Sequence, residues 1–286
     1  MKNLLVVFLA AALLSGCGGY TVSSNQITFA SSRSGNNEIY VMYSDATDVI
    51  RLTNTGNENW SPAWSPDGKQ IAFSRGGRGQ RTRNEIYVMD SDGTNVIHLT
   101  NDGNDNWSPA WSPDGKQIAF SSDRSGNSEI YVMDNDGTDV IRLTNTGNEN
   151  SSPSWSPDGK QLAFSSDRSG NYEIYVMDSD GTDAIQLTNT EGWSPSWSPD
   201  GKQIAFTSRR FGRNTAIFVM DSDGTNAIQL TNTEAVNTSP SWSPDGKQIA
   251  FTSDRFGRNS AIFVMDSDGT NETGPLQNGV KPHWRN

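Results

Sequence analysis

The six-residue motif Trp-Ser-Pro-Asp-Gly-Lys recurs through the chain, and this repetition restricts the possible fold more than any other feature of the sequence. Its copies begin at Trp64, Trp111, Trp155, Trp197 and Trp242. The spacings between them are 47, 44, 42 and 45 residues. Each copy is followed by the same succession of apolar runs, separated by Asp-Arg-Ser-Gly-Asn-like and Asp-Gly-Thr segments. Periods of 20–50 residues are typical of architectures in which each unit stacks on its neighbours.

Each unit predicts four short strands. Pro-Asp-Gly and Asp-Gly are strong hairpin signals, and Ile, Val, Tyr and Phe fill the runs between them. The first strand of a unit has the form Ser-Pro-x-Trp, as at residues 61–64, and we expect it at a sheet edge because proline cannot donate to the ladder. No useful helical period appears after residue 17. Four-stranded units of this length predict a β-propeller.

The two ends of the repeat region complement each other. The strand at 26–29 has no Ser-Pro-x-Trp segment before it, whereas residues 280–284 supply one at the C-terminal end, with Trp284 standing 42 residues after Trp242. We therefore expect an all-β, six-bladed β-propeller of four-stranded blades, whose C-terminal strand completes blade one and closes the ring. Closure removes the exposed sheet edges that an open stack would leave.

The N-terminus has the pattern of a secretory signal. A charged start, Met1-Lys2, precedes an apolar run at 4–14, which is too short to span a membrane. The following Leu-Ser-Gly-Cys17 resembles the lipobox of bacterial lipoproteins, which implies cleavage before Cys17 and lipid attachment to it. The alternative is an ordinary signal peptide with an incidental cysteine. We expect a lipoprotein signal peptide at 1–16, a short tether at 17–25 and the propeller at 26–286.

Composition excludes several function classes. The net charge of -11 argues against nucleic acid as a partner, and two histidines cannot build a three-histidine metal site. The recurrent Asp-x-Asp-Gly segments lack the later Gly and Glu of a calcium loop, so we interpret them as tight turns. No Ser-His-Asp set and no Gly-x-Ser-x-Gly elbow is present, and near-identical repeats do not bring unlike groups together. We predict no catalytic residue, no metal site and no cofactor.

The unit Trp-Ser-Pro-Asp-Gly-Lys-Gln-Ile-Ala-Phe…Glu-Ile-Tyr-Val-Met-Asp resembles the TolB-type WD-like propeller repeat, over residues 26–284. The resemblance implies a propeller of the cell envelope that binds a protein, because TolB-type propellers act in the periplasm and bind the peptidoglycan-associated lipoprotein. The chain departs from this family in two ways. The family has an α/β domain before its propeller, where this chain has only the segment 17–25 after the predicted cleavage site, and the family is soluble rather than lipidated. No partner-contact residue is therefore carried over.

Differences between the repeats indicate a binding face. In a propeller, the loops leading to the innermost strands and the loops between second and third strands lie on one face, at the mouth of the channel. Aromatic and arginine side chains gather in these segments, and such residues dominate binding interfaces. The predicted partner-binding residues are Trp60, Trp107, Trp193, Arg209, Arg210, Phe211, Arg213, Phe256 and Arg258. For the tryptophans, packing against a neighbouring blade is the alternative.

These features together predict a lipid-anchored, monomeric, non-enzymatic scaffold that binds a protein or peptide of the envelope. In a double-membraned bacterium, we expect it on the outer membrane, facing the periplasm. Two alternatives remain open. One is an envelope hydrolase or lyase that uses mouth carboxylates such as Glu58 and Asp105. The other is a cation- or ligand-binding sensor. The acidic residues of the mouth loops are Glu58, Asp105, Glu149, Glu191 and Glu234.

Overall fold

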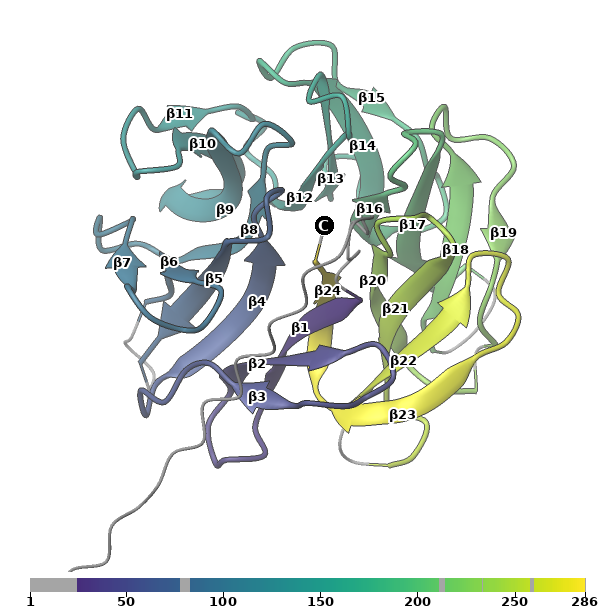
Figure 1. The fold of residues 1–286 in the computed structure, drawn as a ribbon. Coiled ribbons are helices and arrows are strands. Elements are labelled where there is room, and N and C mark those ends of the chain that lie inside the picture. Colours follow the sequence, from purple (N-terminus) through teal and green to yellow (C-terminus); the bar gives the residue numbers. More distant parts are fainter. Residues whose placement is uncertain (1–24, 78–82, 211–213, 233, 258–259, 286) are drawn as a thin grey trace, which may run out of the picture.

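The computed structural model describes residues 25–77, 83–210, 214–232, 234–257 and 260–285, and these form a ring of six four-stranded antiparallel sheets (Figure 1). The predicted six-bladed β-propeller is thereby confirmed. Each blade runs from an innermost strand beside the central channel to a two- or six-residue outer strand. Within the described ranges, no helix is long and apolar enough to cross a membrane.

The strands of each blade follow one another along the chain, except in blade one. Blade one contains β24 (Val280–Trp284), β1 (Gln26–Ser31), β2 (Glu38–Tyr43) and β3 (Ile50–Arg51). Blade two contains β4 (Glu58–Trp64), β5 (Gln70–Gly76), β6 (Glu85–Asp90) and β7 (Ile97–His98). Blade three contains β8 (Asn106–Trp111), β9 (Gln117–Ser125), β10 (Asn127–Asp134) and β11 (Ile141–Arg142). Blade four contains β12 (Asn150–Trp155), β13 (Gln161–Ser166), β14 (Glu173–Asp178) and β15 (Ile185–Gln186). Blade five contains β16 (Trp193–Trp197), β17 (Gln203–Ser208), β18 (Ala216–Asp221) and β19 (Ile228–Gln229). Blade six contains β20 (Asn237–Trp242), β21 (Gln248–Ser253), β22 (Ala261–Asp266) and β23 (Thr273–Asn278).

The ring closes through β24, as expected from the repeat. This strand pairs antiparallel with β1, placing Trp284 opposite Ile27 and His283 opposite Thr28. The backbone N–H of Arg285 donates to the carbonyl of Gln26 at 2.8 Å, which extends the pairing beyond the strand. Figure 1 shows the yellow C-terminal strand beside the purple β1, with the C-terminal end near the centre of the ring. The last strand of the chain therefore forms the channel wall of the first blade.

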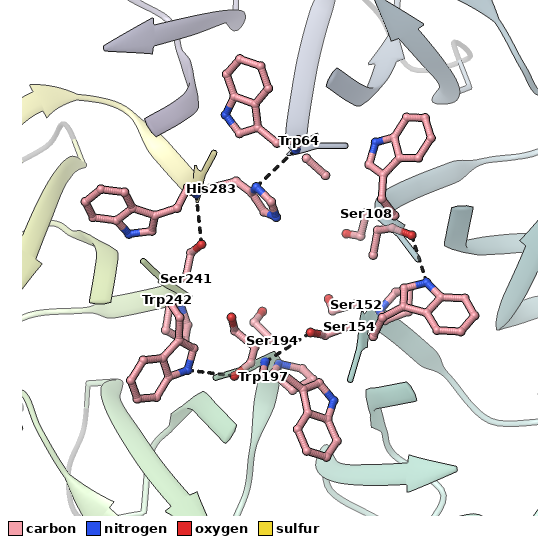
Figure 2. A pocket seen from close by; sticks show the side chains of 18 of the residues that line it. Trp64, Ser108, Ser152, Ser154, Ser194, Trp197, Ser241, Trp242 and His283 are labelled. Atoms are coloured by element: carbon pink, nitrogen blue, oxygen red, sulfur yellow. Dashed lines mark hydrogen bonds between the residues drawn. The ribbon is translucent and has the colours of Figure 1, made fainter. Parts of the chain in front are cut away.

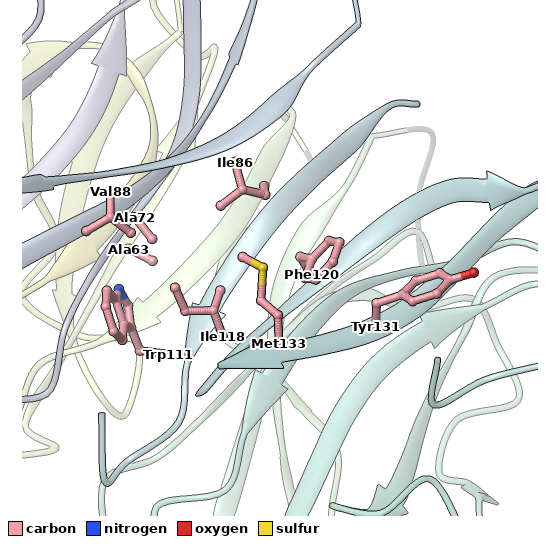
Figure 3. Packing of buried hydrophobic residues seen from close by; sticks show 9 residues of the cluster. All are labelled: Ala63, Ala72, Ile86, Val88, Trp111, Ile118, Phe120, Tyr131 and Met133. Carbon is pink, nitrogen blue, oxygen red and sulfur yellow. The ribbon is translucent and has the colours of Figure 1, made fainter. Parts of the chain in front are cut away.

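The hydrophobic core lies between the blades rather than inside them. In the cluster drawn in Figure 3, Ala72 and Ile86 of blade two pack against Trp111, Phe120 and Met133 of blade three. Five further clusters repeat this arrangement around the ring. Each blade thus buries its apolar faces only against its two neighbours, as in other repeat proteins, so the closure of the ring completes the core.

The Asp-x-Asp-Gly segments are tight turns that also touch the preceding blade. Asp136 Oδ1 accepts hydrogen bonds from the backbone N–H and the hydroxyl of Thr138, at 3.0 and 2.6 Å. The side-chain hydrogen bond from Thr138 lowers the pKa of Asp136 below its usual value. Gly137 has a φ of +90°, and a Cβ on it would come within 2.8 Å of the Leu99 carbonyl oxygen. The interpretation of these segments as structural turns is confirmed.

The two faces of the ring carry different loops. On one face, the loops between second and third strands bond to the segments entering the innermost strands, as in Asn59 N–H to Asn37 O at 2.8 Å and Asn106 N–H to Asn84 O at 2.7 Å. We call this the mouth face. On the opposite face, the hairpins after the first and third strands meet, as in Ser91 N–H to Lys69 O at 2.8 Å.

Candidate functional site: the central channel and the mouth face

The innermost strands of all blades line one cavity on the ring axis, with a volume of about 450 Å³ (Figure 2). Every strand contributes its proline and the residue before it. That preceding residue has a positive φ of 50° to 56°, an uncommon conformation for a residue with a Cβ. The surrounding blades impose it, since the backbone N–H of Ser152 donates to Ser121 Oγ at 3.1 Å and that of Lys281 to Thr252 Oγ1 at 3.0 Å. Each blade therefore presents one side chain to the channel from a fixed backbone position.

The tryptophans that end the innermost strands form the channel wall. All six are between 2% and 9% exposed and belong to the interblade clusters. Some also bond across the joint between blades, as in Trp155 Nε1–H to the Ala110 carbonyl and Trp242 Nε1–H to the Ser196 carbonyl, both at 3.2 Å. These repeated tryptophans serve the fold.

Blade one departs from the repeat at two channel positions. The other blades carry serine before the proline, and alanine or serine after it, whereas β24 carries Lys281 and His283 there. Lys281 Nζ donates to Ser61 Oγ of blade two at 2.7 Å. Burial in the channel lowers the pKa of Lys281 below its usual value. Among the described residues that line the cavity, Lys281 and His283 are the only titratable groups.

His283 takes over a hydrogen bond that serine makes in two other blades. Its Nδ1 accepts from the backbone N–H of Trp64 at 3.3 Å, as Ser154 Oγ accepts from Trp197 N–H at 3.4 Å and Ser241 Oγ from Trp284 N–H at 3.3 Å (Figure 2). Burial lowers the pKa of His283 to about 4. The imidazole is therefore neutral at pH 7. With Nδ1 as the acceptor, its proton is on Nε2.

Six of the predicted partner-binding residues belong to the described chain, and one of them, Trp60, packs partly against the core. Trp60, Trp107 and Trp193 are partly exposed at the start of their innermost strands, and Trp60 packs against the cluster between blades one and two. The Arg209 guanidinium lies 5.6 Å from the centre of the Trp193 ring, a cation–π distance, and Arg209 and Arg210 are exposed. Phe256 is 70% exposed, with its ring 5.9 Å from that of Phe263. The residues Cys17, Phe211, Arg213 and Arg258 lie outside the described residues.

The arginines of the Arg-Ser-Gly-Asn loops have structural partners that sequence reasoning did not identify. The Arg124 guanidinium stacks 5.2 Å from the Phe120 ring and 4.7 Å from the Tyr131 ring, and its Nε donates to Ser122 Oγ at 3.0 Å. Equivalent stacks occur at Arg33, Arg168 and Arg255. The signal was the Phe of each second strand opposite the Tyr or Phe of the third, which creates an aromatic surface at the loop.

Three of the acidic residues of the mouth loops connect neighbouring blades through their side chains. Glu58 Oε2 accepts from the backbone N–H and Nδ2 of Asn37 at 2.9 and 2.8 Å, and Asp105 Oδ1 accepts from the same two groups of Asn84 at 2.8 and 3.0 Å. Glu149 Oε2 accepts from the Ser128 N–H at 3.2 Å. Across the described part of the chain, no group of three His, Cys, Asp or Glu residues could hold a metal ion.

Comparison with known proteins agrees with the fold. The family model of the TolB beta propeller domain matches residues 15–107, 59–190, 145–215 and 190–279. A TolB homologue of Chlorobaculum tepidum is 40% identical over 57 residues, a stretch that covers 20% of this chain and only 13% of that protein.

Two solved structures are similar over most of the chain. The TolB of Acinetobacter baumannii superposes with a TM-score of 0.78 and 27% identity, covering 92% of this chain and 67% of that one. A protein assigned as a TolB from Agrobacterium tumefaciens gives a TM-score of 0.72 and 25% identity, covering 90% of each chain. The family model matches nearly the whole propeller, and on these grounds the chain belongs to the TolB beta-propeller domain family.

Proposed function

We propose that this protein is a lipid-anchored scaffold of the cell envelope, which binds a protein or peptide on its mouth face and catalyses no reaction. Membership of the TolB propeller family supports protein binding in the envelope. The tether, the lipid on Cys17 and the monomeric state belong to the same proposal. Binding would use rigid display, in which the ring fixes the backbone and the variable loops carry the contacts.

The observation that carries the proposal is the aromatic and cationic surface on blades five and six. Arg209 stacks on Trp193. Phe256 lies at a loop tip with 70% of its surface exposed, so a large apolar ring is available for contact with a partner. Tryptophan and arginine are the residues most often found to dominate binding energies at interfaces. The mouth carboxylates support a non-catalytic role, since Glu58 and Asp105 hold loops through paired hydrogen bonds.

A capture experiment with matched variants tests this proposal. The full-length wild type, a Trp193→Ala/Arg209→Ala/Phe256→Ala variant and an Ile185→Ala/Ile228→Ala control are immobilised and exposed to an envelope extract of the source cells. Ile185 and Ile228 are each 63% exposed on the outer strands, away from the mouth face. We expect the wild type and the control to retain the same envelope protein, and the mouth variant to lose it while keeping its melting temperature. Equal retention by all three folded proteins would remove the mouth face from the proposal.

Lipid attachment has its own test. Cells that produce the wild type or Cys17→Ser are grown with labelled palmitate, and envelope fractions are separated. We expect label only on the wild type, with the Cys17→Ser protein released from the membrane fraction. Label on neither protein would refute the anchor while leaving the binding proposal to its own experiment.

A further inference from the structure

We propose that the central channel is a binding site for a small carboxylic acid, whose carboxylate is held by Lys281 and whose apolar body lies along the prolines and alanines of the facing strands. The site lies on the ring axis rather than on the mouth loops, so it is separate from the partner surface proposed above. Its two distinguishing residues both come from β24, the strand that closes the ring.

The charge of the channel selects an anion. Each of the other lysines in the described chain pairs with an aspartate two residues earlier, as Lys69 does with Asp67 at 3.1 Å and Lys247 with Asp245 at 3.4 Å. Lys281 instead has a hydroxyl partner, Ser61, and no carboxylate is present among the described residues that line the cavity. For a lysine in a confined channel whose described lining holds no carboxylate, a bound anion supplies the opposite charge that favours the ammonium form.

The polar groups around Lys281 suit one carboxylate. Serines stand at the equivalent positions of the other five innermost strands, so the level of Lys281 is a ring of hydroxyls. Closer to the opposite face, neutral His283 keeps Nδ1 occupied by Trp64 N–H and retains an N–H donor on Nε2. One cation with neutral donors matches a singly charged carboxylate. A phosphate dianion is better matched by several cations or by backbone N–H groups.

The size and walls of the cavity limit the rest of the ligand. A volume of about 450 Å³ lies within the usual range for small-molecule sites. Blades two and three present Ala63 and Ala110 where other blades present serine or histidine, which leaves an apolar side to the channel. A short aliphatic acid therefore satisfies both the cation and the apolar wall.

The repeat itself argues that Lys281 does more than fasten the ring. At the same backbone position, with nearly the same φ, the other five blades use serine. A lysine there must order a long side chain, at a larger entropic cost than serine. The structural requirement of the position is met by serine five times, so a ligand gives a reason for the sixth residue.

The experiment uses variants that restore the repeat. Lys281→Ser and His283→Ser give blade one the residues found in other blades, so both should fold, and circular dichroism and thermal melting check this. Binding to the full-length protein is measured by titration calorimetry and by shifts of the tryptophan indole N–H signals. The probes are butyrate, neutral butyramide and inorganic phosphate. Acetyl-dialanine, with a free or an amidated end, distinguishes a chain terminus from a free acid.

We expect butyrate or the free-ended peptide to bind the wild type at pH 7. Lys281→Ser should weaken that binding about 10- to 100-fold, as expected for loss of a charged hydrogen bond, and His283→Ser should weaken it less. Butyramide and the amidated peptide should not bind. Equal binding to the wild type and folded Lys281→Ser would overturn the proposal. It would also be overturned if phosphate alone bound, or if no carboxylate bound below about 10 mM.

Discussion

The joints between blades are of two kinds. In blades one to four, the third strand carries a glutamate at or near its start that is buried or partly buried: Glu38, Glu85, Glu129 and Glu173. In blades five and six the same position holds Ala216 and Ala261. At the joint between blades three and four, Glu129 accepts from the Thr144 hydroxyl, from Asn150 Nδ2 at 2.8 Å and from Arg142 at 2.7 Å. At the joint between blades five and six, Thr215 Oγ1 donates to the Asn237 carbonyl at 2.8 Å, and Ala261 packs into the apolar cluster there. Ala216 packs into the cluster between blades four and five.

The comparison teaches that a carboxylate is one solution to a blade joint rather than a requirement of the ring. Replacing a buried polar group by apolar packing is often neutral for stability, whereas removing one partner of a buried network is not. The blades without the carboxylate are also those whose mouth loops carry the Trp193–Arg209 stack and the exposed Phe256. The loss of this carboxylate and these two surface features therefore occur in the same two blades.

The largest effect is expected at the joint that β24 closes. Removal of Gly279–Asn286 deletes the innermost strand of blade one and exposes β1 and the faces of blades two and six. We expect loss of the cooperative melting transition and aggregation, because an open ring leaves apolar faces and a strand edge unpaired.

A milder version of the same change removes only the ring of Trp284, which is 2% exposed. Trp284→Ala should cost about 3–5 kcal/mol in the free energy of unfolding, measured in urea. If the protein without Gly279–Asn286 melted at the same temperature as the wild type, the stability of the ring would not depend on this joint.

A carboxylate joint is broken by Glu129→Ala. This change leaves Asn150 and Thr144 without their buried acceptor, and we expect a loss of about 3 kcal/mol in the free energy of unfolding. Asp136→Ala, at an exposed turn of the same blade, is the control and should lower stability much less than Glu129→Ala, because its hydrogen bonds are exposed to water. If Glu129→Ala were as mild as the control, the two kinds of joint would be equivalent.

Acid should destabilise the joint between blades one and two through His283. Burial lowers the folded-state pKa of His283 to about 4, whereas the unfolded chain takes up this proton near the usual value of about 6.5. Above pH 6.5 both states are unprotonated, so the group has no effect there. As the pH falls from 6.5 to 4, the unfolded state alone is protonated, and the wild type should lose up to about 3 kcal/mol of stability. Lys281 is the other titratable group that lines the channel in the described chain.

The measurement is the difference between the wild type and His283→Ser in urea titrations at several pH values. Subtracting the variant removes the contributions of other groups, such as Glu85, whose pKa burial raises. A difference that stays constant between pH 7 and 4 would contradict the lowered pKa of His283.

The smallest effect concerns a contact common to both kinds of joint, the Asp-Gly turn against the preceding blade. Gly137 and Gly126 both have positive φ, but a Cβ on Gly137 would meet the Leu99 carbonyl oxygen at 2.8 Å, whereas Gly126 faces open space. Both alanine variants should lose stability through the backbone conformation, and Gly137→Ala should lose about 1 kcal/mol more. Thermal melting of the pair gives this difference, and equal losses would show that the turn can move away from its neighbour.

Much of this architecture could be predicted from the repeat. Five copies of one motif determine the blade, and the shortened first unit with Trp284 at the far end predicts the closure. The Asp-Gly turns could also be predicted, because the residues that form each turn, such as Asp136, Gly137 and Thr138, are neighbours in the sequence. Such features depend on local geometry or on repetition, and both are visible in one sequence.

The remaining features depend on contacts between strands. The sequence pattern predicts that the loop arginines belong to a binding face. The aromatic rings that contact Arg124 come from two different strands, and the loop sequence does not show how those strands are paired. Lys281 was visible as a departure from serine, yet its position on the ring axis and its partner Ser61 follow only from the closure. The role of a residue that departs from the repeat therefore depends on which side chains of the neighbouring blade it contacts.

The start of the propeller has a consequence for orientation. Asn25 bonds through its carbonyl to the N–H of Ser44, in a hairpin of the face opposite the mouth, and Gln26 lies beside Arg285 at the same level. A lipid attached through the proposed tether would pull on that face. The face opposite the mouth would then lie toward the bilayer, and the mouth face with Trp193 and Phe256 would point away from it, as would the channel end nearer Lys281.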